Sequence, residues 1–156
     1  MMGRNGRVVI DELENLRDQL QRLDQGKVDK FIDDCAKELA ARLLAKVIKR
    51  TPVGEYESGS GKVGGTLRRG WTGDKNQNGT SYAKSLPIHH FGNATVIEIV
   101  NPVEYASYVE FGHRTRNHKG WVKGRFMLTI SEQEIQNVAP TIIEKKLKKQ
   151  LGELFR

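Results

Sequence analysis

The chain of 156 residues contains one cysteine, four prolines and no long apolar run. A single cysteine excludes an internal disulfide and a cysteine-based zinc site, so Cys35 is expected to be a small core residue. No window approaches the run of about 18 apolar residues that predicts a membrane-spanning helix. The apolar run at residues 8–10 is too short for a signal peptide. These absences predict a protein that stays in the cytoplasm where it is made.

Acidic residues are also in the minority. The chain has 26 Lys and Arg against 19 Asp and Glu, a formal net charge of +7, 37% hydrophobic residues and a mean hydropathy of −0.57. This composition predicts one domain over residues 1–156 with a modest core. The positive charge favours an acidic partner, either nucleic acid or an acidic protein surface, and does not choose between them.

The usual signatures of an enzyme are missing. A His-His pair, an asparagine and a later histidine loosely resemble the His-Asn-His nucleases, but Asn101 is predicted to cap a helix and the later histidines fall in a loop. His113 and His118 lack the spacing of a helical zinc pair. There is no Gly-x-Ser-x-Gly elbow and no Gly-Lys-Ser/Thr phosphate loop. The sequence therefore predicts a non-enzymatic protein without a cofactor or metal. The four histidines concerned are His89, His90, His113 and His118.

Helical periodicity occurs in three parts of the chain. Residues 11–23 place a leucine every third or fourth position and predict a short amphipathic helix or a paired segment. Residues from about 125 to 138 predict a helix, followed by a kink or break at Pro140 and a second helix to the end. The strongest helix is predicted over 27–50, ending at Thr51-Pro52 because the residue before proline disfavours helical geometry. Its apolar stripe comprises Val28, Phe31, Ile32, Cys35, Leu39, Leu43, Val47 and Ile48.

Three strand signals separated by turns predict an antiparallel sheet. They lie at 67–72, at 81–90 with an interruption at Pro87, and at 94–100. The predicted fold class is therefore α+β. An antiparallel sheet would pack against the long N-terminal helix, a short central helix and one or two C-terminal helices.

The short central helix is predicted over residues 101–112. Asn101 is a suitable N-cap, Pro102 suits the first helical position, and Gly112 can end the helix in the left-handed conformation. Tyr105 and Tyr108 share one face with Val109 and are expected to be core residues.

Two loops stand out from these elements. Residues 53–66 contain five glycines and predict a mobile arm, which would become ordered, if at all, on binding a partner. Residues 113–124 predict a basic loop around Trp121, which can hold a phosphate backbone, contact another subunit, or simply be solvated with Trp121 in the core. The basic residues concerned are Arg114, Arg116, Lys119, Lys123 and Arg125. The lysines at 145–149 predict a solvated helical face.

Four segments together resemble a known family. They are Thr51-Pro-Val-Gly54, Gly65-Thr-Leu-Arg-Arg-Gly70, Asn101-Pro-Val-Glu-Tyr-Ala-Ser-Tyr-Val-Glu-Phe-Gly-His113 and Arg125-Phe-Met-Leu128. This pattern resembles the tail-completion family of long-tailed bacteriophages and prophages, also described as head–tail joining or minor tail components. The resemblance covers roughly residues 28–138. The chain departs from the family pattern by its long glycine arm and by the lysine-rich stretch after Pro140.

The resemblance implies a structural protein of the virion neck that joins tail to head, assembled in the host cytoplasm as a ring such as a hexamer. Its implied partners are other copies of itself, the connector or neck proteins, and tail-tube or tail-terminator proteins. Contact with DNA would be non-specific. The implied fold and ring-interface residues are Pro52, Leu67, Arg68, Tyr105, Ala106, Tyr108, Glu110 and Gly112, and Glu110 could pair with an arginine of the adjacent subunit. The alternative hypothesis is a basic, non-enzymatic DNA-binding protein.

Overall fold

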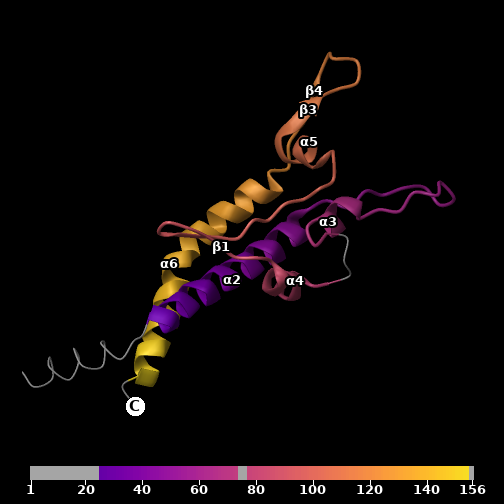
Figure 1. Cartoon of the computed structure of the whole chain (residues 1–156). Coiled ribbons are helices and arrows are strands. Elements are labelled where there is room, and N and C mark those ends of the chain that lie inside the picture. Colours follow the sequence, from indigo (N-terminus) through magenta and orange to yellow (C-terminus); the bar gives the residue numbers. More distant parts are fainter. Residues whose placement is uncertain (1–24, 74–76, 155–156) are drawn as a thin grey trace, which may run out of the picture.

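Two long helices form the body of the molecule (Figure 1). The computed structural model describes residues 25–73 and 77–154. Helix α2 (Gln25–Arg50) and helix α6 (Met127–Leu154) pack in opposite directions, because Lys46 pairs with Glu134 while Glu38, earlier in α2, pairs with Lys146. Between them in the chain come α3 (Thr66–Gly70), α4 (Gly79–Ser85) and α5 (Ala106–Phe111). The helix expected over residues 11–23 lies outside the described residues.

Helix α2 confirms the expectation for residues 27–50. Its buried face centres on Ala40, Leu44 and Val47, of which the last two are fully buried. Val28 and Ile32, at the beginning of the expected stripe, are 36% and 42% exposed. The helix packs mainly on α4 and α6. It is therefore the centre of a helical layer, and the expectation that a sheet would be its main partner is wrong.

Helix α6 continues through Pro140, so the expected break is wrong. Proline has no N–H for the carbonyl four residues earlier, but one missing bond does not end a helix that is held on both sides. Glu134 lies before Pro140 and binds Lys46 and Arg50 of α2, while Lys146 lies after it and binds Glu38. The anchoring of both halves to α2 keeps the helix continuous.

Helices α3 and α4 occupy two regions that were expected to be strands. In α3 the buried side chains Leu67 and Trp71 are four residues apart, which is helical spacing. In α4 the side chain of Asn78 accepts a hydrogen bond from the Ser81 N–H at 2.8 Å and caps the helix. Ala83 then packs against α2 with no exposed surface. The helical conformation of α3 and α4 is therefore determined by capping and by burial against the core, which outweigh the local strand propensity of the two segments.

The strands form two separate antiparallel ribbons. Strand β1 (His89–Phe91) pairs with β2 (Ala94–Val96), and β3 (Gly112–Arg114) pairs with β4 (Trp121–Lys123). The α+β class is confirmed, with two-stranded sheets. The strand expected over 94–100 ends at Val96, although residues 97–100 keep the alternation of half-buried and exposed side chains. Ile97 and Ile99 pack on the core without a ladder partner.

The core lies where α2, α3, α4 and α6 meet. Its buried cluster is Ala40, Leu44, Val47, Leu67, Trp71, Ala83 and Met127. Cys35 is 6% exposed, as expected of a small core residue. Within residues 25–73 and 77–154, no helix combines the length and the apolar character that crossing a membrane requires.

Candidate functional site

The end of α2 is held by a group of hydrogen bonds on Thr51, which has no exposed surface. Trp71 Nε1 donates to Thr51 Oγ1 at 2.7 Å, and Arg68 Nη2 donates to the Thr51 carbonyl at 2.7 Å. Thr51 Oγ1 itself donates to the Val47 carbonyl at 2.6 Å. These bonds join α3 to the last turn of α2 and satisfy a carbonyl that the helix leaves without an internal partner. We call residues 51, 68 and 71 the Thr51 hub.

Asn101 connects the central segment to the hub. Its Nδ2 donates to the Leu67 carbonyl at 2.7 Å, and its Oδ1 accepts from the Val103 N–H at 3.2 Å. Helix α5 begins only at Ala106, preceded by Tyr105 without a side-chain cap. The expectation that Asn101 caps a helix beginning at Pro102 is therefore wrong. Its amide bridges two segments, and the residues between it and α5 stay irregular.

Glu110 is a buried carboxylate, 5% exposed, at the end of α5. Its Oε2 accepts from the Leu128 N–H at 2.9 Å, while its Oε1 accepts from the N–H and the hydroxyl of Thr129 at 2.9 and 2.7 Å. The carboxylate thus satisfies the free N–H groups at the start of α6, where the helix dipole favours negative charge. This gives Glu110 three hydrogen bonds within its own chain, and the pairing with an arginine of an adjacent subunit stays a prediction.

Gly112 is required where α5 turns into β3. Its φ is +85°, and a Cβ there would collide with the carbonyl of Val122 and approach the Gly124 nitrogen to 2.8 Å. A side chain is therefore excluded both by conformation and by the close approach of β4. The expectation that this glycine ends the central helix is confirmed.

The β3–β4 ribbon projects from the end of the helix pair, with the chain reversing at its tip (Figure 1). Its register pairs Gly112 with Lys123, His113 with Val122 and Arg114 with Trp121. Side chains alternate across a strand, so Arg114, Trp121 and Lys123 share one face. His113 and Val122 share the other, where the His113 ring lies 5.8 Å from the ring of Tyr108.

Four aromatic side chains are exposed around this ribbon. The exposed fractions are 44% for Tyr105, 60% for Tyr108, 61% for Phe111 and 62% for Trp121. We call these four residues the aromatic surface. The expectation that the tyrosines of the central helix are core is wrong, and so is the interpretation that buries Trp121. The sequence pattern gave no sign of Phe111, which faces solvent at the last position of α5.

Charge is distributed unequally between the ribbon and the helix pair. Among the described residues, the side chains of Arg114, Arg116, Lys119, Lys123 and Arg125 have no hydrogen bond or ion pair. In contrast, Lys46 and Arg50 hold Glu134 at 2.8 Å each, and Lys146 holds Glu38 at 2.7 Å. Hydrogen bonds from Lys46 and Arg50 lower the pKa of Glu134, and those from Lys146 and Arg42 lower the pKa of Glu38.

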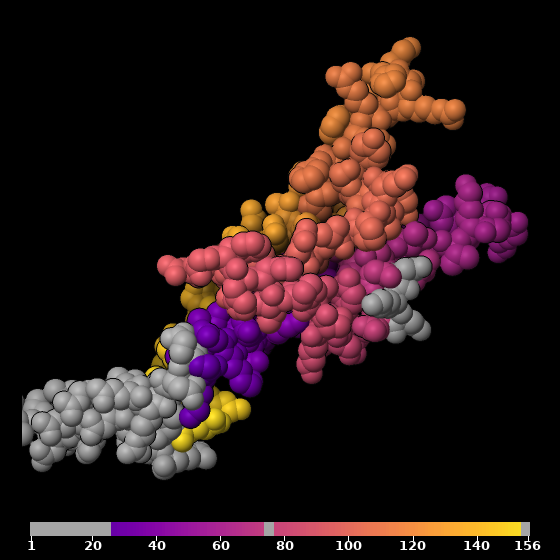
Figure 2. Space-filling view, in the orientation of Figure 1, coloured from indigo at the N-terminus to yellow at the C-terminus, as the bar shows by residue number. Residues whose placement is uncertain are grey.

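The glycine-rich arm is a second projection beside the ribbon (Figures 1 and 2). Its two sides run close together, since a Cβ on Gly64 would collide with the Gly54 carbonyl. The Lys62 ammonium lies 5.8 Å from the centre of the Tyr56 ring. Between the arm and α5 lies a groove of about 240 Å³. Its apolar lining includes Val53, Tyr56, Val63, Tyr105 and Val109.

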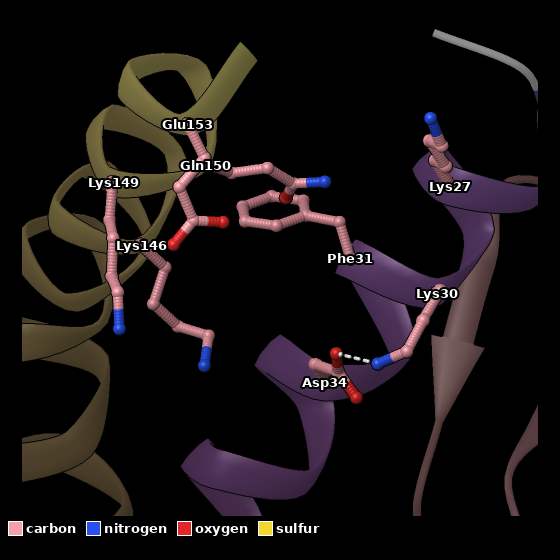
Figure 3. A pocket seen from close by; sticks show the side chains of 8 residues that line it. All are labelled: Lys27, Lys30, Phe31, Asp34, Lys146, Lys149, Gln150 and Glu153. Atoms are coloured by element: carbon pink, nitrogen blue, oxygen red, sulfur yellow. Dashed lines mark hydrogen bonds and ion pairs between the residues drawn. The ribbon is translucent and has the colours of Figure 1, made fainter. Parts of the chain in front are cut away.

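A separate hollow of about 330 Å³ lies at the opposite end of the helix pair, between the start of α2 and the end of α6. Figure 3 shows Phe31 and Gln150 lying between the two helices, with lysines on both sides. Lys30 is paired with Asp34 at 2.6 Å, and Lys146 is paired with Glu38. These cations are engaged within the chain, so the hollow is a weaker candidate site than the projecting end.

The expected interface residues divide into two groups. Leu67 is in the core, Arg68 belongs to the hub, and Glu110 and Gly112 fix the joints between α5, β3 and α6. Pro52 follows the hub and lines the groove. Tyr105 and Tyr108 instead face solvent.

The histidines form no metal site, because the described part of the chain contains no group of three or more His, Cys, Asp or Glu side chains suited to a metal.

The fold and this geometry define an α+β protein in which a helix pair presents an aromatic and basic end. The family described as "Bacteriophage HK97-gp10, putative tail-component" matches residues 14–112, more than half of the chain. The chain therefore belongs to this family of bacteriophage tail components, as the resemblance in the sequence predicted. Comparison with curated proteins and with solved structures found no match.

Proposed function

We propose that this tail component is a non-enzymatic joining protein that assembles as a ring between the head and the tail of the virion. The observation that carries the proposal is the aromatic surface, with three side chains about 60% exposed at one end of the molecule. Tyrosine and tryptophan are the residues most enriched at the centres of protein interfaces, since they bury a large area with few rotatable bonds.

The distribution of burial supports this role. Trp71 is the one buried aromatic side chain among the described residues, whereas Tyr56 and Phe91 are exposed in addition to the aromatic surface. A monomeric protein rarely keeps a large apolar patch in water, because the hydrophobic effect favours its burial. A neighbouring subunit, or a connector or tail protein, would cover it in the assembled virion.

The experiment is deletion of the gene in the phage that encodes the chain, followed by electron microscopy of the lysate. The proposal predicts filled heads and complete free tails that remain separate, and recovery of joined particles when purified protein is added. Tails of abnormal length, or no tails at all, would instead assign the chain to tail building and contradict the joining role.

A second candidate function is non-specific contact with DNA. The specific observation is that Arg114, Trp121 and Lys123 share one face of the ribbon and that both cations lack an ion pair among the described residues. An aromatic ring between cations can hold a phosphate backbone and stack on a base. We expect duplex affinity to fall with salt, and Arg114→Gln with Lys123→Gln to reduce the log–log salt slope by roughly 2. Affinity that does not change with salt would exclude this contact.

A further inference from the structure

The projecting end carries two surfaces of opposite character. The ribbon and its connections, residues 113–125, contain five basic residues and no acidic residue. The arm carries Glu55 and Glu57, both exposed and without an ion pair among the described residues, and one cation, Lys62, which lies over the Tyr56 ring. Figure 2 shows the ribbon and the arm as separate projections that point in different directions. Unpaired charges of opposite sign on two different surfaces are suited to contact between two molecules.

The groove beside the arm supplies the apolar part of such a contact. Its volume of about 240 Å³ is below the roughly 300–1,000 Å³ of most small-molecule sites, so it suits a single large side chain. Tyr56 is 52% exposed and Val63 is 74% exposed, and with Tyr105 they leave the groove open to solvent. An aromatic anchor from a partner would bury these side chains.

Trp121 is the side chain that fits this requirement. It lies on the basic face of the ribbon with Arg114 and Lys123, and 62% of it is exposed. Exposed ion pairs contribute little net affinity because water and salt screen them, so charge alone does not hold two chains together. A tryptophan inserted in an apolar groove supplies affinity, while the surrounding charges set orientation and the association rate.

We propose that the basic ribbon of one copy docks on the arm of a second copy, with Trp121 in the groove and Arg114 and Arg116 facing Glu55 and Glu57. The inference rests on the proposed ring and deepens it by naming the two surfaces that meet. A contact between two different surfaces of the same chain is head-to-tail, and it generates a ring when the rotation closes. Each copy then uses its own ribbon and its own arm once.

The test is charge reversal on each side, with self-association measured by sedimentation velocity. One variant carries Glu55→Lys and Glu57→Lys, and the other carries Arg114→Glu and Arg116→Glu. All four side chains are exposed and have no ion pair among the described residues, so both variants should keep the wild-type circular dichroism. The matched control carries Glu98→Lys and Glu132→Lys, which reverse two exposed carboxylates elsewhere.

We expect each reversed variant to associate at least tenfold more weakly than wild type, while the control stays within about twofold. An equimolar mixture of the two variants should recover association, because reversed arms then meet reversed ribbons and native arms meet native ribbons. Trp121→Ala should weaken association roughly 30-fold or more. Together these results would establish the pairing.

Three results would overturn the pairing. The first is a wild-type chain that stays monomeric at the highest soluble concentration. The second is an oligomer whose association responds to the reversals no more than to the control, and the third is a mixture that fails to recover. In the second case the oligomer forms without this contact, and in the third the reversals weaken association by a route other than this pairing. The head–tail joining role is tested separately, by electron microscopy of the gene-deletion lysate, so its failure can be distinguished from failure of this pairing.

Discussion

The two tryptophans of the chain show how differently its regions are built. Trp71 is 3% exposed, donates its indole N–H to Thr51 and packs against the core of the helix pair. Trp121 is 62% exposed on a ribbon whose cations lack ion pairs among the described residues. Trp71 buries its ring and hydrogen-bonds its indole nitrogen within the chain. Trp121 leaves its ring and its indole nitrogen available to another molecule.

The difference extends to the charges around each region. Near the hub, Arg50 binds Ser131 and Glu134, and Lys46 binds Glu134. On the ribbon and its loop, the five cations have no carboxylate partner among the residues that the structure describes. The charges near the hub are therefore paired within the chain, while those of the projecting end are available to another molecule. Substitutions in the two regions should separate stability from assembly.

The largest contrast is expected between Trp71→Ala and Trp121→Ala. Truncating a buried tryptophan should lower the free energy of unfolding by about 3–5 kcal/mol, because it leaves a cavity and removes the bond to Thr51. Truncating the exposed tryptophan should change stability by less than about 0.5 kcal/mol. Urea denaturation followed by circular dichroism measures both. Equal losses would show that Trp121 is part of the folded core.

Glu110 tests whether a motif residue acts inside the chain. Glu110→Ala leaves two N–H groups at the start of α6 without their acceptor and should cost about 2–3 kcal/mol. Glu110→Gln keeps one acceptor and should cost about 1 kcal/mol. The same denaturation measurement applies, with the exposed Glu104→Ala as control. A stable Glu110→Ala chain that no longer assembles would return Glu110 to an intersubunit role.

Pro140 tests the continuity of α6. Because proline has no N–H for the Gln136 carbonyl, Pro140→Ala should restore a helical bond and raise the free energy of unfolding by about 1–2 kcal/mol. The neighbouring Thr141→Ala serves as control. Amide hydrogen exchange of residues 137–144 would show the gain directly. A loss of stability on Pro140→Ala would mean that the helix bends at this position to meet α2.

The ion pairs of the helix pair predict a small dependence on pH. Both Glu134 and Glu38 have a lowered pKa in the folded chain, relative to an ordinary value of 4.5. Their contribution is therefore present above about pH 4.5 and is lost as the pH falls through the lowered folded-state pKa. Glu134→Gln with Glu38→Gln should make stability fall less steeply below pH 4.5. Glu98→Gln, at an exposed site, is the control, and an unchanged slope in the double variant would contradict the assignment.

The sequence predicted two kinds of feature correctly: a helix with a long apolar stripe, and a position where the backbone requires glycine. The helix over 27–50 has eight stripe positions and a proline stop, and Gly112 must take a positive φ, which is +85° with a ψ of 172°. Among the short elements, the strand at 94–96 and the end of the central helix at Gly112 were predicted, whereas α3 and α4 were wrongly predicted as strands. Leu67 and Trp71 fit a strand as well as a single helical turn, and only packing on the Thr51 hub selects the helix.

The basic loop around Trp121 and the tyrosines of the central segment were separate candidates in the sequence. The structure places both at the projecting end, which sequence spacing did not indicate. Their exposure could not be read from spacing, since Tyr105 and Tyr108 have the periodicity of a core face. The role of Glu110 has no local signal either, because its partners Leu128 and Thr129 are 18 and 19 residues away.

The most direct test of the account counts joined particles in lysates of phage that carry Trp121→Ala, with Phe91→Ala as the matched control. Phe91 is 66% exposed on the β1–β2 ribbon, so both variants remove an exposed aromatic side chain and differ in the region they change. The account predicts separate heads and tails for Trp121→Ala and normal particles for Phe91→Ala. Normal joining in both would contradict the claim that the projecting end makes the assembly contact.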